Sequence, residues 1–269
     1  MRIFSVIVLL LMLSACGGGS GGGGLSTNTC SVLGLPTKSL RIINGTACAS
    51  LNASPVVRVV VYDNRGNPLG LCSGSMLTSR HVLTAAHCIV EGTRLAAVIF
   101  GDVSDTSLVR AASFRAHPDY VPIARVGGTF ASFNDIAVFT LQNDVSLPTL
   151  PVLSSRQVES GERIAIFGYG VDEKGNLDFE ELRSGEMLVT TVTSNHISAF
   201  FEGDGSNTCQ GDSGGPAIVR INGEPVLAGV TSSGTNQDCG KGDNSLFINL
   251  NSRKALDFIF SIAPNARRK

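Results

Sequence analysis

The feature that most constrains this chain is a succession of short apolar or alternating runs, each bounded by turn residues. Runs of this length, rich in Val, Ile, Phe and Thr, are typical of β-strands, and Asn222-Gly223 is a hairpin-type turn. Helical periodicity is nearly absent except over 253–263, which predicts a terminal helix. The pattern therefore favours an all-β sandwich or barrel. The predicted strands include 56–62, 94–100, 163–167, 186–192, 216–220, 226–230 and 246–250.

Composition sets the class of protein. With 43% hydrophobic and 16% charged residues, the chain suits a globular fold with a sizeable core. Its length allows one large all-β domain or two smaller ones, and the proline-containing stretch 147–152 is a candidate junction between two β halves. A net charge of −1 without basic clusters gives no reason to expect a nucleic-acid partner.

The N-terminus has the pattern of a targeting signal. Arg2 precedes an almost wholly apolar stretch over 3–13, which is too short to span about 30 Å of hydrocarbon. Leu13-Ser14-Ala15-Cys16 resembles the lipobox of bacterial lipoproteins, in which the cysteine is lipidated. We expect residues 1–15 to be a lipoprotein signal peptide and Cys16 to anchor a cell-envelope protein to a lipid membrane, facing the periplasm or the exterior. The alternative is an ordinary signal peptide and a secreted protein.

Cysteine usage agrees with an oxidising compartment. Of seven cysteines, six remain once Cys16 is set aside, an even set suited to three disulfides. No C-x-x-C or His-x-x-x-His spacing indicates a structural metal site, and we expect neither metal nor cofactor. The pairing of the six is left open by their spacing.

A candidate nucleophile lies in Gly211-Asp212-Ser213-Gly214-Gly215-Pro216. A serine between glycines suits a sharp turn where backbone N–H groups converge, but a neutral hydroxyl needs a base, usually histidine. The Gly-x-Ser-x-Gly spacing also matches the nucleophile elbow of α/β-hydrolases, whose histidine follows the serine. No histidine follows His196 here, and helices do not separate the strands, so that alternative is rejected.

The base and its orienting acid can be ranked by their surroundings. His87 lies among small residues and beside Cys88, whereas His81, His117 and His196 are in turn-like or loop-like contexts. The acid that orients a catalytic imidazole should be buried. Asp135 is the best candidate because it opens an apolar run.

Three segments, in order, resemble the signature segments of the chymotrypsin/trypsin-like serine protease family. They are Leu83-Thr84-Ala85-Ala86-His87-Cys88, Asn134-Asp135-Ile136-Ala137 and the glycine-rich hexapeptide around Ser213. Arg41-Ile42-Ile43-Asn44-Gly45 is similar to the family's zymogen activation site. The resemblance covers about 42–260. It implies two antiparallel six-stranded β-barrels of chymotrypsin type within a protease domain over 42–269, preceded by a Gly/Ser-rich tether and activation propeptide over 16–41.

The resemblance also implies the roles of individual residues. Ser213 would attack the scissile carbonyl, His87 would move its proton to the leaving amine, and Asp135 would fix the imidazole tautomer. The N–H groups of Gly211 and Ser213 would form the oxyanion hole.

Activation would follow cleavage between Arg41 and Ile42. The new ammonium of Ile42 would then pair with the buried carboxylate of Asp212, so the uncleaved chain should have a poorly formed oxyanion hole. The implied disulfides are Cys72–Cys88 and Cys209–Cys239, which leaves Cys30 and Cys48 to pair. That last bond would keep the propeptide attached after activation.

The substrate pocket departs from the family pattern. Relatives that prefer basic residues carry an aspartate six residues before the nucleophile, and this chain has Asn207 there. The other expected pocket residues are Thr208, Ser232, Gly234 and Ser245. A neutral pocket should not stabilise a desolvated Arg or Lys, so we expect an uncharged residue before the scissile bond and a separate activating protease. Asp238 or Asp243 could reach the pocket if the alignment over 239–245 shifts, but the favoured interpretation places both in surface loops.

Three functions remain open after these steps. The favoured one is a serine endopeptidase that acts on protein or peptide substrates. The second is a surface binding protein on a catalytically retired protease fold, against which the intact His87, Asp135 and Ser213 argue. The third is an esterase-like hydrolase that uses the same three residues.

Overall fold

The computed structural model describes residues 29–39, 45–49, 51–101, 105–126, 129–171, 179–203, 205–236 and 238–269. The predicted lipidation site Cys16 and the predicted cleavage site Arg41–Ile42 lie outside these residues. Within them, no helix is both long and apolar enough to cross a membrane.

The first half of the fold is a closed barrel with strand order β10-β5-β4-β3-β6-β7. All its neighbouring strands are antiparallel. The strands are β3 (Val56–Tyr62), β4 (Pro68–Met76), β5 (His81–Thr84), β6 (Leu95–Phe100), β7 (Ser107–Ala116) and β10 (Ala137–Leu141). Valine dominates β3, where the branched side chains fit a pleated surface, and almost every residue of that strand is buried.

The second half is also a closed antiparallel barrel. Its strands are β11 (Arg163–Gly168), β12 (Arg183–Val192), β13 (His196–Phe200), β14 (Pro216–Ile221), β15 (Glu224–Ser233) and β16 (Asn244–Asn249). Pairing between β12 and β13 closes the ring. Asn222 and Gly223 both have positive φ, 54° and 82°, as a tight hairpin between β14 and β15 requires.

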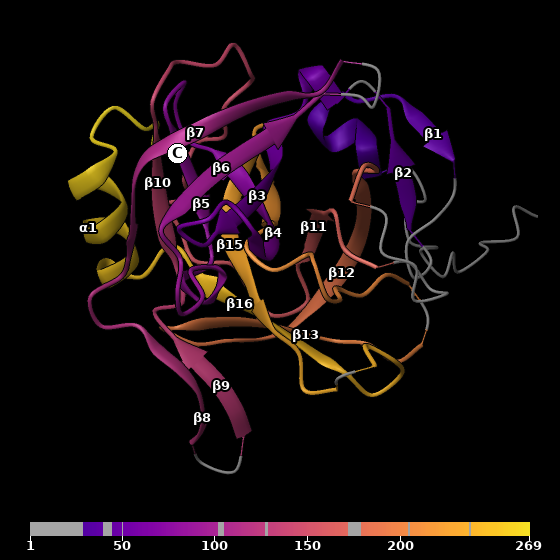
Figure 1. Ribbon diagram of the computed structural model, residues 1–269. Coiled ribbons are helices and arrows are strands. Elements are labelled where there is room, and N and C mark those ends of the chain that lie inside the picture. Colours follow the sequence, from indigo (N-terminus) through magenta and orange to yellow (C-terminus); the bar gives the residue numbers. More distant parts are fainter. Residues whose placement is uncertain are drawn as a thin grey trace, which may run out of the picture.

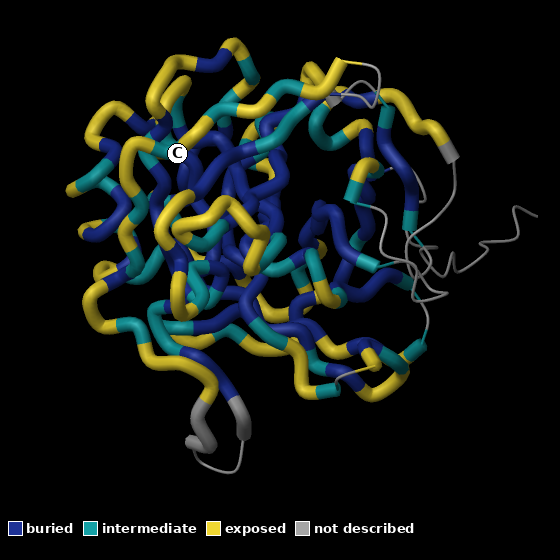
Figure 2. Tube along the Cα trace, viewed as in Figure 1, coloured by how far each residue is buried: buried dark blue, intermediate teal, exposed yellow. Residues whose placement is uncertain are grey.

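Two six-stranded antiparallel barrels followed by a helix confirm the predicted fold class (Figure 1). The segment between the barrels runs from 142 to 162 and contains the predicted junction 147–152. Buried residues fill the interior of both barrels (Figure 2). The helix α1 (Arg253–Ile262) is capped by Ser252, whose hydroxyl accepts from the N–H of Ala255.

The remaining short helices and strands belong to neither ring of six strands. They are the 3-10 helices η1 (Thr29–Leu33), η2 (Leu51–Ala53) and η3 (Ala86–Cys88), and the strands β1 (Thr37–Ser39), β2 (Thr46–Cys48), β8 (Val121–Val126) and β9 (Thr129–Phe133). The β8–β9 hairpin extends away from the barrels (Figure 1). Sequence analysis did not anticipate it or the β1–β2 pair.

The N-terminal segment is joined to the second barrel. Strand β2 pairs with β1 on one side and with β12 on the other. Cys30 and Leu35 are buried in the same apolar cluster as residues of the barrels. The hydroxyl of Thr29 lies 2.6 Å from that of Ser184 on β12. Residues 29–39 therefore belong to the folded domain.

Candidate active site

His87 and Asp135 form a two-point contact between the ends of neighbouring strands. Nδ1 of His87 lies 2.7 Å from Oδ2 of Asp135, and the backbone N–H of His87 donates to Oδ1 at 2.8 Å. Strand β5 leads into η3, which carries His87, while Asp135 precedes β10, and these two strands pair. The sheet register thus brings together two residues that are 48 positions apart.

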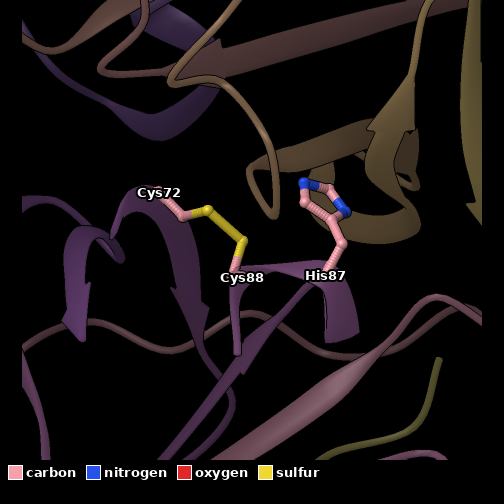
Figure 3. A group of neighbouring side chains, drawn as sticks. All are labelled: Cys72, His87 and Cys88. Carbon is pink, nitrogen blue, oxygen red and sulfur yellow. A yellow bond between two sulfur atoms is a disulfide. The ribbon is translucent and has the colours of Figure 1, made fainter. Parts of the chain in front are cut away.

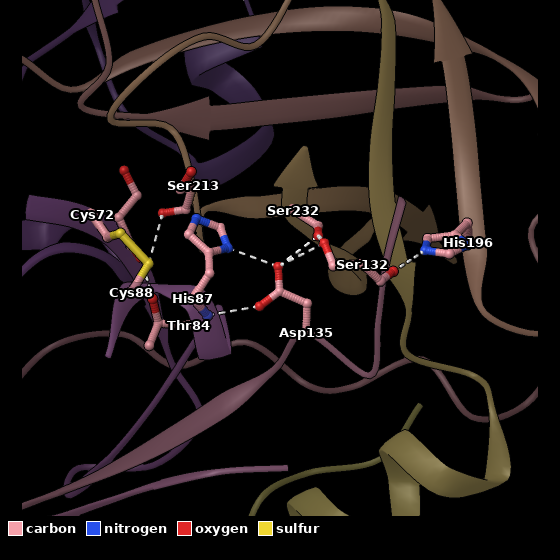
Figure 4. Close-up of polar contacts among 10 residues, drawn as sticks. Cys72, Thr84, His87, Cys88, Ser132, Asp135, His196, Ser213 and Ser232 are labelled. Atoms are coloured by element: carbon pink, nitrogen blue, oxygen red, sulfur yellow. Dashed lines mark hydrogen bonds and ion pairs between the residues drawn. A yellow bond between two sulfur atoms is a disulfide. The ribbon is translucent and has the colours of Figure 1, made fainter. Parts of the chain in front are cut away.

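Ser213 lies on the side of the imidazole away from Asp135 (Figure 4). It and His87 line the same cavity, which has a volume of about 560 Å³. The backbone carbonyl of Ser213 accepts from the N–H of Ser73 on β4 at 2.8 Å, which ties the turn to the first barrel. The predicted nucleophile and base therefore share one accessible site at the junction of the two barrels.

Asp135 is held as a carboxylate by its neighbours. It is completely buried, and burial by itself would raise its pKa. The hydrogen bond and charge of His87, with a further hydrogen bond from Ser232, outweigh burial and lower the pKa below its usual value. An ionised Asp135 can orient the imidazole and stabilise its protonated form.

Two serines that come from other strands support Asp135 (Figure 4). The hydroxyl of Ser232, on β15, donates to Oδ2 at 2.6 Å. Ser132, on β9, lies 2.9 Å from Ser232 and 3.4 Å from Oδ2. Sequence analysis placed Ser232 in the pocket wall, where it does lie, but missed its contact with Asp135 and missed Ser132 altogether. Only the meeting of the two barrels brings these hydroxyls together.

The glycine-rich turn has the backbone shape that its sequence suggested. Gly211 and Gly214 have φ of 94° and 80°, values that favour glycine. A Cβ on Gly214 would also collide with Oγ1 of Thr84 and the carbonyl of Ser73. The proposed use of the Gly211 and Ser213 N–H groups as an oxyanion hole stays a prediction.

Asp212 is buried and does not line the cavity of Ser213. Its Oδ1 accepts from the N–H of Gly170 and its Oδ2 from that of Cys209, both at 2.9 Å. Burial raises its pKa to about 6, partly offset by these two hydrogen bonds and by the charge of Arg183. No ion pair among the described residues includes Asp212. Its predicted partner, Ile42, lies outside them.

The three expected disulfides are confirmed: Cys30–Cys48, Cys72–Cys88 and Cys209–Cys239. Figure 3 shows His87 beside the second of these bonds. The sulfur atoms of Cys72 and Cys88 are bonded to each other and so cannot act as thiolate ligands. The grouping of these three side chains therefore does not make a metal site.

The other histidines do not line the cavity of Ser213. His81 opens β5, with Nδ1 2.8 Å from the hydroxyl of Thr78, and His117 packs against Phe258 of α1. His196 is buried at the start of β13, where its Nε2 lies 2.6 Å from the carbonyl oxygen of Ser132. Its turn-like sequence context was therefore misleading.

The predicted pocket residues fall into two layers. Thr208, Ser232 and Gly234 line the cavity. Asn207 and Ser245 are buried just behind this lining, where the hydroxyl of Ser245 donates to Oδ1 of Asn207 and lies 2.7 Å from Oγ1 of Thr208. Asn207 thus contacts residues that line the cavity but does not line it itself.

One interpretation of the pocket was wrong. Asp243, which we took for a surface-loop residue, is 1% exposed and lines the cavity with His87 and Ser213. Its Oδ2 accepts from Nδ2 of Asn207 at 2.8 Å. The pocket therefore contains a buried carboxyl group, so it lacks the neutral wall on which the expected preference for an uncharged residue was based. Asp238, in contrast, is exposed.

Comparison with known proteins places this site in a family. Residues 42–259 match the family model described as Trypsin. The chain belongs to the trypsin family. This trypsin-family chain is 34% identical over 174 residues to Serine protease SP24D of Anopheles gambiae, covering 58% of this chain and 60% of the relative. It is 28% identical over 228 residues to Proclotting enzyme of Tachypleus tridentatus, with coverages of 74% and 60%.

A third relative is Vitamin K-dependent protein C of Mus musculus, 27% identical over 237 residues, or 76% of this chain and 48% of that protein. The trypsin-family chain thus spans three fifths or less of the length of these relatives. The family expected from the three signature segments is confirmed.

Proposed function

We propose that the protein is a serine endopeptidase in which Ser213 is the nucleophile, His87 the general base and Asp135 the orienting acid. The observation that carries this proposal is the 2.7 Å contact between Nδ1 of His87 and the buried carboxylate of Asp135, with Ser213 in the same cavity. Protein or peptide chains are the proposed substrates.

In the proposed mechanism, the hydroxyl of Ser213 attacks the scissile carbonyl carbon while Nε2 of His87 takes the hydroxyl proton. The imidazolium that forms is stabilised by Asp135 and then gives the proton to the leaving amine, which departs as the acyl-enzyme forms. Water, deprotonated by the same imidazole, then attacks the acyl carbon; the bond to Oγ of Ser213 breaks, His87 returns the proton to Oγ, and the acid product is released. N–H groups of Gly211 and Ser213 would stabilise the oxyanion, each worth about 3–4 kcal/mol of barrier.

The enzyme is proposed to be made as a latent precursor. Asp212 has a raised pKa and accepts only hydrogen bonds from the backbone among the described contacts, so a new cation beside it would be strongly favoured. Cleavage between Arg41 and Ile42 by an activating protease would supply that cation as the ammonium of Ile42. The Cys30–Cys48 bond would then keep residues before the cleavage site attached.

Attachment to a lipid membrane through Cys16, in a bacterial cell envelope, is proposed on the lipobox-like sequence alone. Replacing Cys16 by serine should move the protein from the membrane fraction to the soluble fraction. Unchanged fractionation with membranes would overturn the lipid anchor.

The decisive test of the enzyme is labelling with a fluorophosphonate probe before and after cleavage at Arg41–Ile42. We expect a Ser213 adduct in the cleaved protein, little in the uncleaved protein, and none in a Ser213→Ala variant. A cleaved, folded protein that is not labelled would favour the retired binding protein. Labelling without hydrolysis of any peptide, but with hydrolysis of simple esters, would favour the esterase.

A further inference from the structure

Asp243 is a carboxyl group built into the wall of the active-site cavity. Gly234, also in the lining, has no side chain, and a Cβ there would lie 2.8 Å from Oδ2 of Asp243 and 2.9 Å from Oδ1. The absence of a side chain at Gly234 therefore leaves room for the carboxyl group against the cavity. Any substituent at this position would cover it.

The carboxyl group of Asp243 accepts hydrogen bonds from neutral groups only, among the described residues. Oδ1 accepts from the N–H of Thr235 at 2.7 Å and from that of Asn236 at 2.8 Å, with the hydroxyl of Thr235 at 3.2 Å. Oδ2 accepts from Nδ2 of Asn207. All four donors are neutral groups, so none of them supplies a positive charge beside the carboxyl group.

Hydrogen bonds also orient the side-chain amide of Asn207 toward Asp243. Its Oδ1 accepts from the hydroxyl of Ser245 at 2.7 Å, and its Nδ2 also donates to the carbonyl of Cys239 at 2.9 Å. These contacts fix the amide so that its donor faces Asp243. Asn207 occupies the position where relatives that prefer basic residues carry an aspartate. Here it donates a hydrogen bond to a different aspartate, Asp243.

The charge of Asp243 is not matched by a described cation. None of the ion pairs found among the described residues includes Asp243, and the nearest cation in sequence, Lys241, is exposed. A buried anion held by neutral donors is best compensated by a cation that enters the same cavity. The side chain of a substrate residue can provide it.

We propose that Asp243 determines specificity, and that the cavity accepts a lysine or arginine side chain before the scissile bond. This inference rests on the proposed endopeptidase function and replaces the expected preference for an uncharged residue. It has a consequence for activation, because the predicted activation bond follows Arg41. A second, already cleaved copy of this chain would then serve as the activating protease.

The test begins with the cleaved protein and four peptides that differ only before the scissile bond, in Arg, Lys, Gln or Met. We expect kcat/KM to be on the order of 100-fold higher for Arg or Lys than for Gln or Met. Benzamidine should inhibit competitively at a concentration at least about 10-fold lower than its neutral isostere benzamide. Equal inhibition by the two compounds, or a preference for Gln or Met, would refute the proposal without any mutation.

The variant Asp243→Asn should lose the preference, with kcat/KM for Arg falling about 100-fold and that for Met changing little. Asp238→Asn is the matched control because Asp238 is exposed on the same loop, and it should behave as the wild type. Fluorophosphonate labelling of Ser213 in each variant reports an intact catalytic centre. If labelling is normal but Arg is not preferred, the specificity inference fails and the endopeptidase proposal survives.

Self-activation is tested with an uncleaved Ser213→Ala chain as substrate. Cleaved wild-type protein should cut it between Arg41 and Ile42, and cleaved Asp243→Asn protein should cut it about 100-fold more slowly. Failure of an active wild-type enzyme to cut this bond would show that activation needs another protease.

Discussion

The hydroxyl of Ser232 lies 2.6 Å from the carboxylate Oδ2 of Asp135. The same oxygen faces the imidazole of His87, so one atom contacts both the proposed general base and a serine of the other barrel. The carboxylate of Asp135 is therefore held by both halves of the fold, and the geometry of the candidate site depends on how the barrels meet.

Removing that hydroxyl should affect both rate and pH dependence. In Ser232→Ala, Asp135 loses one of the hydrogen bonds that lower its pKa, so its pKa should rise. We expect kcat to fall about 10-fold and activity to be lost at a higher pH on the acid side of the profile. Ser132→Ala removes the 3.4 Å contact with Asp135 and the 2.9 Å contact with Ser232 but keeps the hydrogen bond from Ser232 to Asp135, so it should shift the profile less. Equal effects of the two changes would contradict this reading.

The uncleaved protein should become less stable as the pH rises through about 6. The folded-state pKa of Asp212 is raised from 3.8 to about 6, so the folded chain keeps a proton that the unfolded chain releases at lower pH. The contribution of Asp212 to the free energy of unfolding is fully present below about pH 4 and is lost above the folded-state pKa. The change is on the order of 3 kcal/mol.

Urea unfolding of the uncleaved Ser213→Ala chain between pH 4 and 7.5 measures this change. The double variant Asp212→Asn/Ser213→Ala is the control, and it should lack that part of the pH dependence. Parallel stability curves for the two chains would contradict the prediction.

The Cys30–Cys48 bond should stabilise the domain and retain the propeptide. It closes 18 positions of sequence between two buried cysteines, for which the chain-entropy model gives about 3 kcal/mol. Cys30→Ala/Cys48→Ala should lower the free energy of unfolding by about that amount. After cleavage at Arg41, the wild type should run as one species on a non-reducing gel and the variant as two. Release of the fragment from the wild type without reductant would contradict the prediction.

The β8–β9 hairpin should contribute to substrate binding. Ile123 is 59% exposed and lines the cavity together with Tyr120 and Pro122. Ile123→Ser should raise KM about fivefold for peptides with an apolar residue upstream of the scissile bond and leave kcat unchanged, because the lost contact acts on binding. Val121→Ser is the matched control, since Val121 is 43% exposed but does not line the cavity. Equal changes in KM would exclude a specific role for Ile123.

The three candidate catalytic residues could be found in the sequence because each is embedded in a local motif. His87 beside a disulfide cysteine, Asp135 at the start of an apolar strand, and Ser213 between glycines each have a local physical reason for their neighbours. The supporting residues have no such signal. Ser132 and Ser232 are ordinary strand serines, and only a contact across 100 positions gives them a function.

Asp243 is another residue whose position in the pocket could not be predicted from its local sequence. In sequence it lies in a run of Gly, Lys, Asp and Asn that suggests an exposed loop. The structure buries it because Gly234 has no side chain and because Asn207, Thr235 and Asn236 provide donors to its carboxylate. Burial of a charge depends on donors from distant segments, which local composition does not report.

The alternation of strands and turns, the terminal helix, the three catalytic candidates and the family could all be predicted from local sequence. These depend on period, turn chemistry and short motifs, all of which are local. Three features depend on tertiary contacts: a carboxyl group lines the pocket, two serines contact Asp135, and residues 29–39 pack against the second barrel. Those outcomes depend on which groups meet when the two barrels pack, because hydrogen bonding and burial are properties of the assembled neighbourhood.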